Sequence, residues 1–292
     1  MQSFEGKTAV ITGAASGIGR AVAERFASAR MNVVLADIEQ DALDRTVQEL
    51  QERQFRVIGV QANTMLRDSV QALAARAIEA FGKVHILCNN AGVVTRNEGG
   101  KGIWELPDSD WDWVMGVNFY GVLYGLQAFV PHMLAHGEEG HIVSTASLAG
   151  WMPGGGTYGV TKHGVLSLSE TLYRDLKARN ANISASVLCP GFVNTQIFNA
   201  ERNRPSELTT GAAAPDSGAM AMASAMLSMG KQPSEIAQVV FDSISADRFY
   251  ILPHPAWDNI LQARLDAALA RGAPMSVDFA ELMKRRAAGE QF

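Results

Sequence analysis

A phenol and an amine stand one helical turn apart in this chain, at Tyr158 and Lys162. On a helix, both side chains would share one face. A phenol has a pKa near ~10 and is a poor base at neutral pH, whereas a neighbouring ammonium stabilises the phenolate and lowers that pKa. The pair therefore predicts proton transfer by Tyr158. Because this spacing also occurs on many helices that do no chemistry, the prediction needs support from other residues.

That support comes from a glycine-rich turn near the start of the chain. A short apolar run leads straight into Thr12-Gly13-Ala14-Ala15-Ser16-Gly17-Ile18-Gly19, and a helical pattern follows at once. Glycines let the backbone approach a diphosphate closely, and a helix N-terminus offers unpaired N–H groups and a positive dipole end. The turn predicts a dinucleotide site formed by Gly13, Ser16, Gly17, Ile18 and Gly19. The alternative is an ordinary glycine-rich connection.

Asp37 ends the next predicted strand and bears on the choice of dinucleotide. A carboxylate at this position can accept hydrogen bonds from the adenosine ribose hydroxyls. Its charge would also repel the ribose phosphate of NADP. The sequence therefore favours NAD as the cofactor, although an acidic residue at a strand end can also be present without any ligand.

The elements that must position these residues follow an alternating pattern. Strands are predicted at Lys7–Thr12, Val33–Asp37, Arg56–Gln61, Val84–Asn89, His141–Thr145, Ile183–Leu188 and Phe249–Leu252. Between them, apolar residues recur at helical spacing in Gly19–Ala29, Gln40–Arg53, Ser69–Phe81, Trp111–Met133 and Gly164–Arg179. Such alternation predicts an α/β fold, a doubly wound parallel sheet of the Rossmann type. Its ligand site would lie beyond the carboxyl ends of the strands.

Length and composition favour a single domain. The chain has 292 residues, 47% of them hydrophobic, enough for one large core. We expect a dinucleotide-binding and catalytic domain over residues 1–252, with a substrate-binding excursion at 195–231. A helical extension would follow over residues 253–292, with a helix at Trp257–Ala270. That extension could be a lid, a subunit contact or a capping helix.

Charge and cysteine usage exclude several other classes. The 25 Lys and Arg against 30 Asp and Glu are scattered without a basic stripe, so no nucleic acid is expected as a partner. The N-terminus lacks a signal-peptide pattern and no apolar run is long enough for a membrane helix, which predicts a soluble cytoplasmic protein without membrane contact.

Cys88 and Cys189 each end an apolar segment and suit a buried strand better than a disulfide. The six histidines are dispersed in the sequence, so no metal site is expected.

Further short motifs connect the turn and the Tyr-Lys pair to a known family. Asn89-Asn90-Ala91-Gly92 follows the fourth predicted strand, Ser147 follows the fifth, and Pro190-Gly191-Phe192-Val193-Asn194-Thr195 follows the sixth. In this order, the set resembles the short-chain dehydrogenase/reductase family in its compact single-domain branch, over residues 4–252. The resemblance implies a small-molecule substrate and a homo-oligomer, a dimer or a homotetramer, built on the long helices. The tail from Phe249 to Pro255 is similar to members that oxidise benzylic alcohols in lignin-derived aryl ethers.

The resemblance also implies a role for each matching residue. Ser147 would hydrogen-bond the substrate oxygen, and Tyr158 would donate or accept the proton. Lys162 would bind the nicotinamide ribose and lower the pKa of Tyr158, while Asn118 would help to hold a proton-relay water. The remaining cofactor contacts would lie along the adenosine side or at the nicotinamide: Asn90, Ala91, Gly92, Pro190, Gly191, Val193 and Thr195.

Two positions depart from the family pattern. The residue expected to read the adenine amino group is Asn63 instead of an aspartate, and an amide carbonyl can still accept that hydrogen bond. The interval between Ser147 and Tyr158 is also shorter than usual. Ser144 and Thr145 carry hydroxyls nearby, but Ser147 fits the family's Ser-x-Ala-Gly pattern.

Three functions follow, and the residues favour the first. It is an NAD-dependent oxidoreductase that moves a hydride between nicotinamide and a secondary alcohol or its ketone. The others are an NADPH-dependent ketoacyl or carbonyl reductase and a non-catalytic NAD(H)-sensing regulator. A bulky, apolar or aromatic substrate is expected because adaptable and aromatic side chains cluster near the site: Trp151, Met152, Phe192, Ile197, Phe198, Met220, Met222, Met226 and Met229. Arg202 and Arg204 are the nearby cations that could reach a charged substrate.

Overall fold

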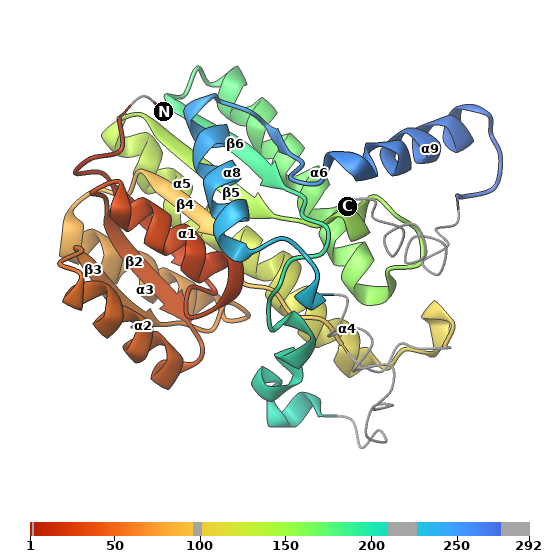
Figure 1. Cartoon of the computed structure of the whole chain (residues 1–292), viewed down its shortest axis with the longest axis horizontal. Coiled ribbons are helices and arrows are strands. Elements are labelled where there is room, and N and C mark those ends of the chain that lie inside the picture. Colours follow the sequence, from red (N-terminus) through yellow and green to blue (C-terminus); the bar gives the residue numbers. More distant parts are fainter. Residues whose placement is uncertain (2, 96–100, 210–226, 276–292) are drawn as a thin grey trace.

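The computed structural model describes residues 1, 3–95, 101–209 and 227–275, and within them one parallel sheet organises the chain (Figure 1). The strand order is β3-β2-β1-β4-β5-β6-β7, which confirms the predicted doubly wound arrangement. Its strands are β1 (Thr8–Thr12), β2 (Asn32–Asp37), β3 (Val57–Gln61), β4 (Ile86–Asn89), β5 (Gly140–Thr145), β6 (Ile183–Leu188) and β7 (Tyr250–Ile251). All seven predicted strands are present, and β7 is shorter than expected.

Helices cover both faces of the sheet because successive side chains of each strand point to opposite sides. On β1, Ile11 belongs to one apolar cluster while Val10 belongs to the other. The first cluster is completed by α1 (Gly17–Ser28), α2 (Gln40–Glu52) and α8 (Pro233–Ser245). The second is completed by α3 (Arg67–Phe81), α5 (Gly121–His136) and α6 (Gly156–Ala178). The continuous apolar runs of β1 and β2 are therefore buried on both sides.

The predicted helix Trp111–Met133 is interrupted. It consists of α4 (Asp108–Met115), a π-helical segment at Gly116–Tyr120, and α5. Gly116 and Gly121 bracket the π segment, and a Cβ at these positions would lie 2.8 Å from Met65 Cε and 3.0 Å from Thr64 Cβ. This close approach places Asn118 beside the sheet. Single π turns within helices occur frequently at functional sites.

Two other helices differ from the sequence prediction. The helix α6 begins at Gly156 instead of Gly164, so Tyr158 and Lys162 both lie within it. The helix α8 was not predicted, although Pro233 at its start and the capping contact from Glu235 to the Gln232 N–H (2.7 Å) are typical helix-start signals.

The long helical run Asp108–His136 has the length and composition to cross a membrane. Half of its most apolar window is buried inside the protein. Trp113, Val122, Phe129 and Met133 are among the side chains that pack into the apolar clusters. A helix that packs against the core of a sheet shows the same length, composition and burial.

The excursion after β6 is closed at its base. Val193 and Lys231 form a parallel bridge, in which the Asn194 N–H donates to the Lys231 carbonyl (2.9 Å). Between them lie two 3-10 helices, η4 (Ile197–Asn203) and η5 (Ser206–Leu208). After β7, the chain forms η6 (Pro255–Trp257) and α9 (Asp258–Leu269), which reaches past the body of the molecule (Figure 1).

Candidate active site

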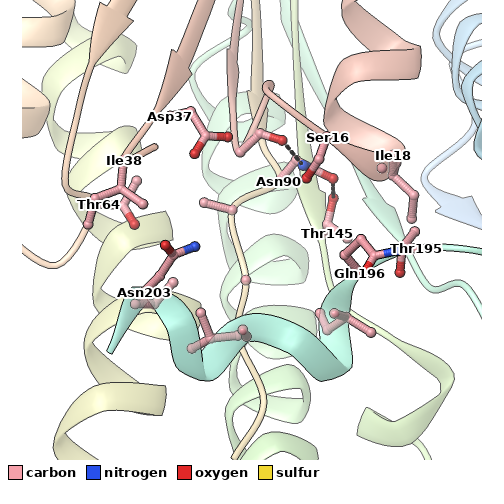
Figure 2. A pocket seen from close by; sticks show the side chains of 18 of the residues that line it. Ser16, Ile18, Asp37, Ile38, Thr64, Asn90, Thr145, Thr195, Gln196 and Asn203 are labelled. Carbon is pink, nitrogen blue, oxygen red and sulfur yellow. Dashed lines mark hydrogen bonds between the residues drawn. The ribbon is translucent and has the colours of Figure 1, made fainter. Parts of the chain in front are cut away.

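One pocket at the carboxyl edge of the sheet contains most of the predicted site residues (Figure 2). The predicted residues that line it are Gly13, Ser16, Gly17, Ile18, Asp37, Asn63, Asn90, Ala91, Gly92, Ser147, Tyr158, Lys162, Pro190, Gly191, Val193 and Thr195. Only Gly19 and Asn118, of the sequence-predicted set, are not part of its lining. Residues from seven separate segments of the sequence therefore converge on one cavity.

The glycine turn has the conformation that a bound diphosphate requires. Gly13 and Gly17 have φ angles of +67° and +54°, in the left-handed region that favours glycine. A Cβ on Gly19 would lie 2.1 Å from the Gly13 carbonyl oxygen, so Gly19 permits the close approach of helix α1 instead of contacting the ligand. The N-cap residue Ser16 makes no side-chain capping bond, so the first N–H groups of α1 are not satisfied by a cap.

The segment after β4 is fixed to this turn by hydrogen bonds. Asn90 Nδ2 donates to the Thr12 carbonyl (3.0 Å), and the Ala91 N–H donates to Thr12 Oγ1 (3.1 Å). Thr145 Oγ1 donates to Asn90 Oδ1 (3.4 Å), as Figure 2 shows. The ends of β1, β4 and β5 are thereby held in register around the pocket floor.

Asp37 points into the pocket from the end of β2 (Figure 2). Its Oδ2 accepts a hydrogen bond from the Ala15 N–H (2.9 Å), and its Oδ1 accepts one from the Glu39 N–H (3.1 Å). Burial raises the pKa of Asp37, and these backbone bonds oppose the rise. A carboxylate oxygen has more than one lone pair, so the Asp37 carboxylate can still accept from a ribose hydroxyl.

A polar contact across the adenosine end of the pocket was missed by the sequence reasoning. Glu39 accepts from Arg202 Nη2 (2.5 Å) and from Asn203 Nδ2 (2.8 Å), both on η4. Burial opposes ionisation of Glu39, but these bonds lower its pKa overall. Figure 2 shows η4 crossing the pocket opposite Asp37. No local signal in the sequence could show that residues so far apart would pair.

Tyr158, Lys162 and Ser147 meet at the other end of the pocket. Lys162 Nζ donates to the Thr145 carbonyl (2.7 Å) and lies 5.5 Å from the centroid of the Tyr158 ring. Burial lowers the pKa of Lys162 to about 8. Burial also raises the pKa of Tyr158, and a hydrogen bond with the Ser147 side chain opposes that rise. The expected lowering of the Tyr158 pKa is not found, because that pKa is raised and burial is the main cause.

Asn118 acts behind the pocket wall. The side chain is fully buried, and Oδ1 accepts from the Val93 N–H (2.8 Å). Nδ2 donates to the Val93 carbonyl (3.0 Å) and to Thr161 Oγ1 (3.1 Å). Since Val93 lines the pocket, Asn118 connects that wall to helix α6, which carries Tyr158.

The expected substrate-contacting residues are divided between different places. Ile197 lines the pocket, whereas Phe192, Trp151 and Met152 pack into the apolar cluster around Trp257 and Ile260. Phe198 is not in the pocket lining, Met229 is 53% exposed, and Met220, Met222 and Met226 lie outside the described residues. The apolar lining that the sequence did not single out comes from Met65, Val93, Trp113, Val117, Ala200 and Leu227.

Both arginines of the excursion are in ion pairs, and Arg202 also lines the pocket. Arg202 pairs with Glu39, as described above. Arg204 Nη2 lies 2.6 Å from Asp110 Oδ1, with side-chain exposures of 2% and 0%, so the pair is buried. Arg204 also donates to the Leu208 carbonyl (2.8 Å). This buried pair anchors η4 and η5 to helix α4.

Three of the six histidines lie together in space. The rings of His85, His132 and His136 meet in tilted or edge-on contacts at the amino edge of the sheet, opposite the pocket; centroids are 5.4 Å apart for His85 and His136, and 5.2 Å for His132 and His136. His132 Nε2 accepts from the Val84 N–H (3.3 Å) and His136 Nε2 donates to the Val84 carbonyl (2.9 Å). In the part of the chain that the structure describes, no group of His, Cys, Asp or Glu could hold a metal ion.

Comparison with known proteins agrees with this geometry. The family model for short chain dehydrogenase matches residues 7–206. The CLA biosynthesis dehydrogenase/reductase of Lactiplantibacillus plantarum is 32% identical, with 94% of this chain and 97% of the relative covered. The chain belongs to the short-chain dehydrogenase/reductase family and is an oxidoreductase of that family.

Solved structures give the same result. A short-chain dehydrogenase/reductase from Burkholderia phymatum in complex with NAD shares 44% identity and a TM-score of 0.91, covering 95% of this chain and 99% of that one. The C alpha-dehydrogenase of Sphingobium sp. SYK-6 is 32% identical over 95% of this chain and 90% of its own length. The apo structure of LigD from Sphingobium sp. strain SYK-6 has a TM-score of 0.75 at 28% identity, covering 94% of this chain and 100% of that one. The similarity of the tail to the lignin-active members therefore extends to the whole chain.

Proposed function

We propose that the protein is an NAD-dependent alcohol dehydrogenase that oxidises a secondary alcohol to its ketone, or catalyses the reverse reaction, with Tyr158 as the proton-transfer residue. The observation that carries this proposal is that Ser147, Tyr158 and Lys162 line the same pocket as the glycine turn and Asp37. A regulator that senses NAD(H) without turnover would not need Ser147, Tyr158 and Lys162 together.

Nicotinamide, when bound, supplies the hydride acceptor or donor. The residues fit a dinucleotide because Gly13, Ser16, Gly17 and Ile18 line the pocket where helix α1 begins, and no side-chain cap occupies the first N–H groups of that helix. NAD is preferred in this proposal because Asp37 is placed for the ribose hydroxyls and disfavours an added phosphate. Glu39 adds a second carboxylate at that end, but Arg202 balances its charge.

The protein residues handle the proton and the substrate oxygen. Ser147 Oγ donates to the Pro190 carbonyl (3.3 Å) and interacts with the Tyr158 phenol, so a carbinol oxygen would lie between the two hydroxyls. During oxidation, the carbinol proton passes to the Tyr158 oxygen while the hydride leaves the carbinol carbon. In the reduction, the Tyr158 hydroxyl donates that proton to the ketone oxygen. Lys162 supplies positive charge beside the phenolate.

The apolar lining favours a bulky, apolar or aromatic substrate. Trp113, Val117, Ile197 and Leu227 contribute hydrocarbon surface to the pocket. Arg204 is buried against Asp110 and is not available to bind a carboxylate or phosphate, and the charge of Arg202, which also lines the pocket, is paired with Glu39. This protein would act as a soluble cytoplasmic homo-oligomer, a dimer or tetramer, without nucleic acid or membrane partners.

The test is a spectrophotometric screen for NADH production over benzylic, alicyclic and steroidal secondary alcohols, repeated with NADP and with lactate-sized and sugar alcohols. We expect the bulky alcohols and NAD to give the highest catalytic efficiency. Activity confined to small charged substrates would contradict the substrate class. NADH binding without any turnover across the screen would favour the regulator, and preference for NADPH with ketones would favour the reductase.

A further inference from the structure

The C-terminal tail has polar contacts with the turn at Pro190–Phe192. Two of these residues, Pro190 and Gly191, line the cofactor pocket. The Gly191 N–H donates to His254 Nδ1 (3.1 Å), and His254 Nε2 lies 3.1 Å from the Phe192 carbonyl oxygen. Because Nδ1 accepts, the proton is on Nε2, which donates to Phe192. One neutral imidazole therefore bridges the backbone on both sides of the turn, and its side chain is only 2% exposed.

The fit between His254 and the turn is close. A Cβ on Gly191 would lie 3.3 Å from His254 Cγ and 3.3 Å from Leu148 Cδ1, so only glycine fits there without displacing a neighbour. The Phe192 carbonyl also accepts from the Lys231 N–H (3.1 Å). The Phe192 carbonyl therefore joins three parts of the chain. It belongs to the Pro190–Phe192 turn, and it accepts from His254 of the tail and from Lys231 at the base of the excursion.

The same tail supports the catalytic serine. The turn at Ser147 is joined to the cofactor turn because the Leu148 N–H donates to the Pro190 carbonyl (3.0 Å). Leu148 packs in one cluster with Trp257 and Ile260 of the tail, and Arg264 Nη1 donates to the Gly150 carbonyl (3.2 Å). The apolar cluster holds the tail in place, and the polar contacts of His254 act on the turn itself.

We propose that His254 is a positioning residue for the cofactor, which fixes the Pro190–Phe192 turn in the conformation that receives the nicotinamide half. It makes cofactor affinity depend on the C-terminal tail. This inference rests on the proposed function, since it takes the occupant of the pocket to be a nicotinamide dinucleotide.

Two variants separate positioning from packing. His254→Phe keeps a ring in the apolar surroundings but removes both hydrogen bonds, so the Gly191 N–H loses its partner. His254→Asn places an amide oxygen near the former Nδ1 and retains an acceptor for Gly191. Tyr250→Phe is the control, because it removes a hydrogen bond from β7, the strand just before the tail, to Glu170 of α6 (2.8 Å) outside the pocket.

The readouts are the Kd of NADH from fluorescence titration without substrate, the thermal midpoint, and KM for NAD and for the alcohol. An unsatisfied buried donor corresponds to a weakening of about 5- to 100-fold. We expect the NADH Kd of His254→Phe to rise by that amount, with KM for NAD rising more than KM for the alcohol. His254→Asn should recover part of the affinity, and Tyr250→Phe should retain wild-type affinity.

Three outcomes would overturn the proposal. One is a His254→Phe protein that binds NADH like the wild type, even if its thermal midpoint falls. Another is weakened NADH binding in Tyr250→Phe, which would mean that any loosening of the tail has the same effect. If His254→Phe does not fold, His254→Leu, which also lacks an acceptor for the Gly191 N–H, takes its place, and wild-type NADH affinity in that variant would contradict the proposal. NADH affinity is measured without an alcohol, so a wrong assignment of the reaction would leave this test unaffected.

Discussion

Both edges of the sheet carry polar side chains, but their bonding differs. At the amino edge, His85 Nδ1 accepts from the Thr8 N–H (3.0 Å), and its Nε2 contacts Glu138 (2.9 Å). His141 Nε2 contacts Ser186 Oγ (2.6 Å), and that hydroxyl donates onward to a backbone carbonyl. These side chains use their hydrogen-bonding groups on the protein itself.

At the carboxyl edge, the polar groups retain bonding capacity. The first turn of helix α1 has no side-chain cap, and Asp37 can accept further hydrogen bonds. Tyr158 and Lys162 are buried side by side, where each ionised form is disfavoured. A cluster of polar residues therefore indicates a ligand site only when its partners leave donors or acceptors unused.

The largest expected effect is the loss of turnover in Tyr158→Phe. General acid–base catalysis contributes about 10²- to 10⁴-fold, and the ring itself remains in place. We expect turnover to fall by that factor while the NADH Kd changes little, measured by steady-state kinetics and fluorescence titration. Tyr250→Phe serves as the control, since it also removes a phenol hydroxyl. Half of the wild-type rate in Tyr158→Phe would show that another group moves the proton.

Asp110→Ala should reduce stability strongly at the carboxyl edge. It removes the buried carboxylate that lies 2.6 Å from the Arg204 guanidinium and leaves the weaker pair with Glu201 at 3.5 Å, and breaking a buried pair costs about 3–5 kcal/mol. Urea unfolding would measure this loss, and the double variant Asp110→Leu with Arg204→Met should restore much of it. Similar stability of Asp110→Ala and the wild type would mean that η4 and η5 are anchored by other contacts.

The amino edge should limit stability in acid. Burial lowers the pKa of His141 to about 4, from 6.5 in an unfolded chain, so the unfolded state binds more protons between these values. Stability should therefore fall by roughly 3 kcal/mol as the pH decreases from about 6.5 to about 4, and change no further from this group below that. Burial also lowers the pKa of His85 and His132, which adds in the same direction. His141→Asn should flatten the dependence in urea titrations at several pH values, and an unchanged slope would contradict this assignment.

Asp37→Ala should give the smallest of these effects, a narrower preference for NAD. Hydrogen bonds to a charged group contribute about 1.5–3 kcal/mol, which corresponds to about 10- to 100-fold in catalytic efficiency with NAD. Efficiency with NADP should change less or improve. Equal efficiency with the two cofactors in the wild type would refute the role of Asp37.

The part of the pocket formed by the glycine turn and Asp37 was predictable because its signals are local. A strand, a glycine turn and a helix follow one another from Thr8 to Ser28, and Asp37 ends the next strand. The buried runs also predicted all seven strands of the sheet. Short-range patterns suffice where consecutive elements of the chain build the site.

Other contacts of the pocket depended on distant segments of the chain. Nothing near Glu39 predicts its pairing with Arg202, and nothing near Phe192 indicates that it packs on Trp257 instead of lining the pocket. The pKa of Tyr158 was also misjudged, since the spacing to Lys162 is visible in the sequence whereas the cost of burial is not. Such errors arise wherever the same local sequence allows a side chain either to pack in the core or to line the pocket, because tertiary packing then decides which of the two occurs.

The bridge between Val193 and Lys231 has a consequence for how the substrate range of this fold can diversify. Because the excursion is closed at its base, its length can change without altering the register of β6 or the position of Gly191. The entropy of closing a loop grows only logarithmically, so that doubling its length costs about 0.6 kcal/mol. Insertions beyond η5, past the buried pair of Arg204 and Asp110, would therefore add little loop-closure entropy and would leave the contacts of η4 with the pocket unchanged.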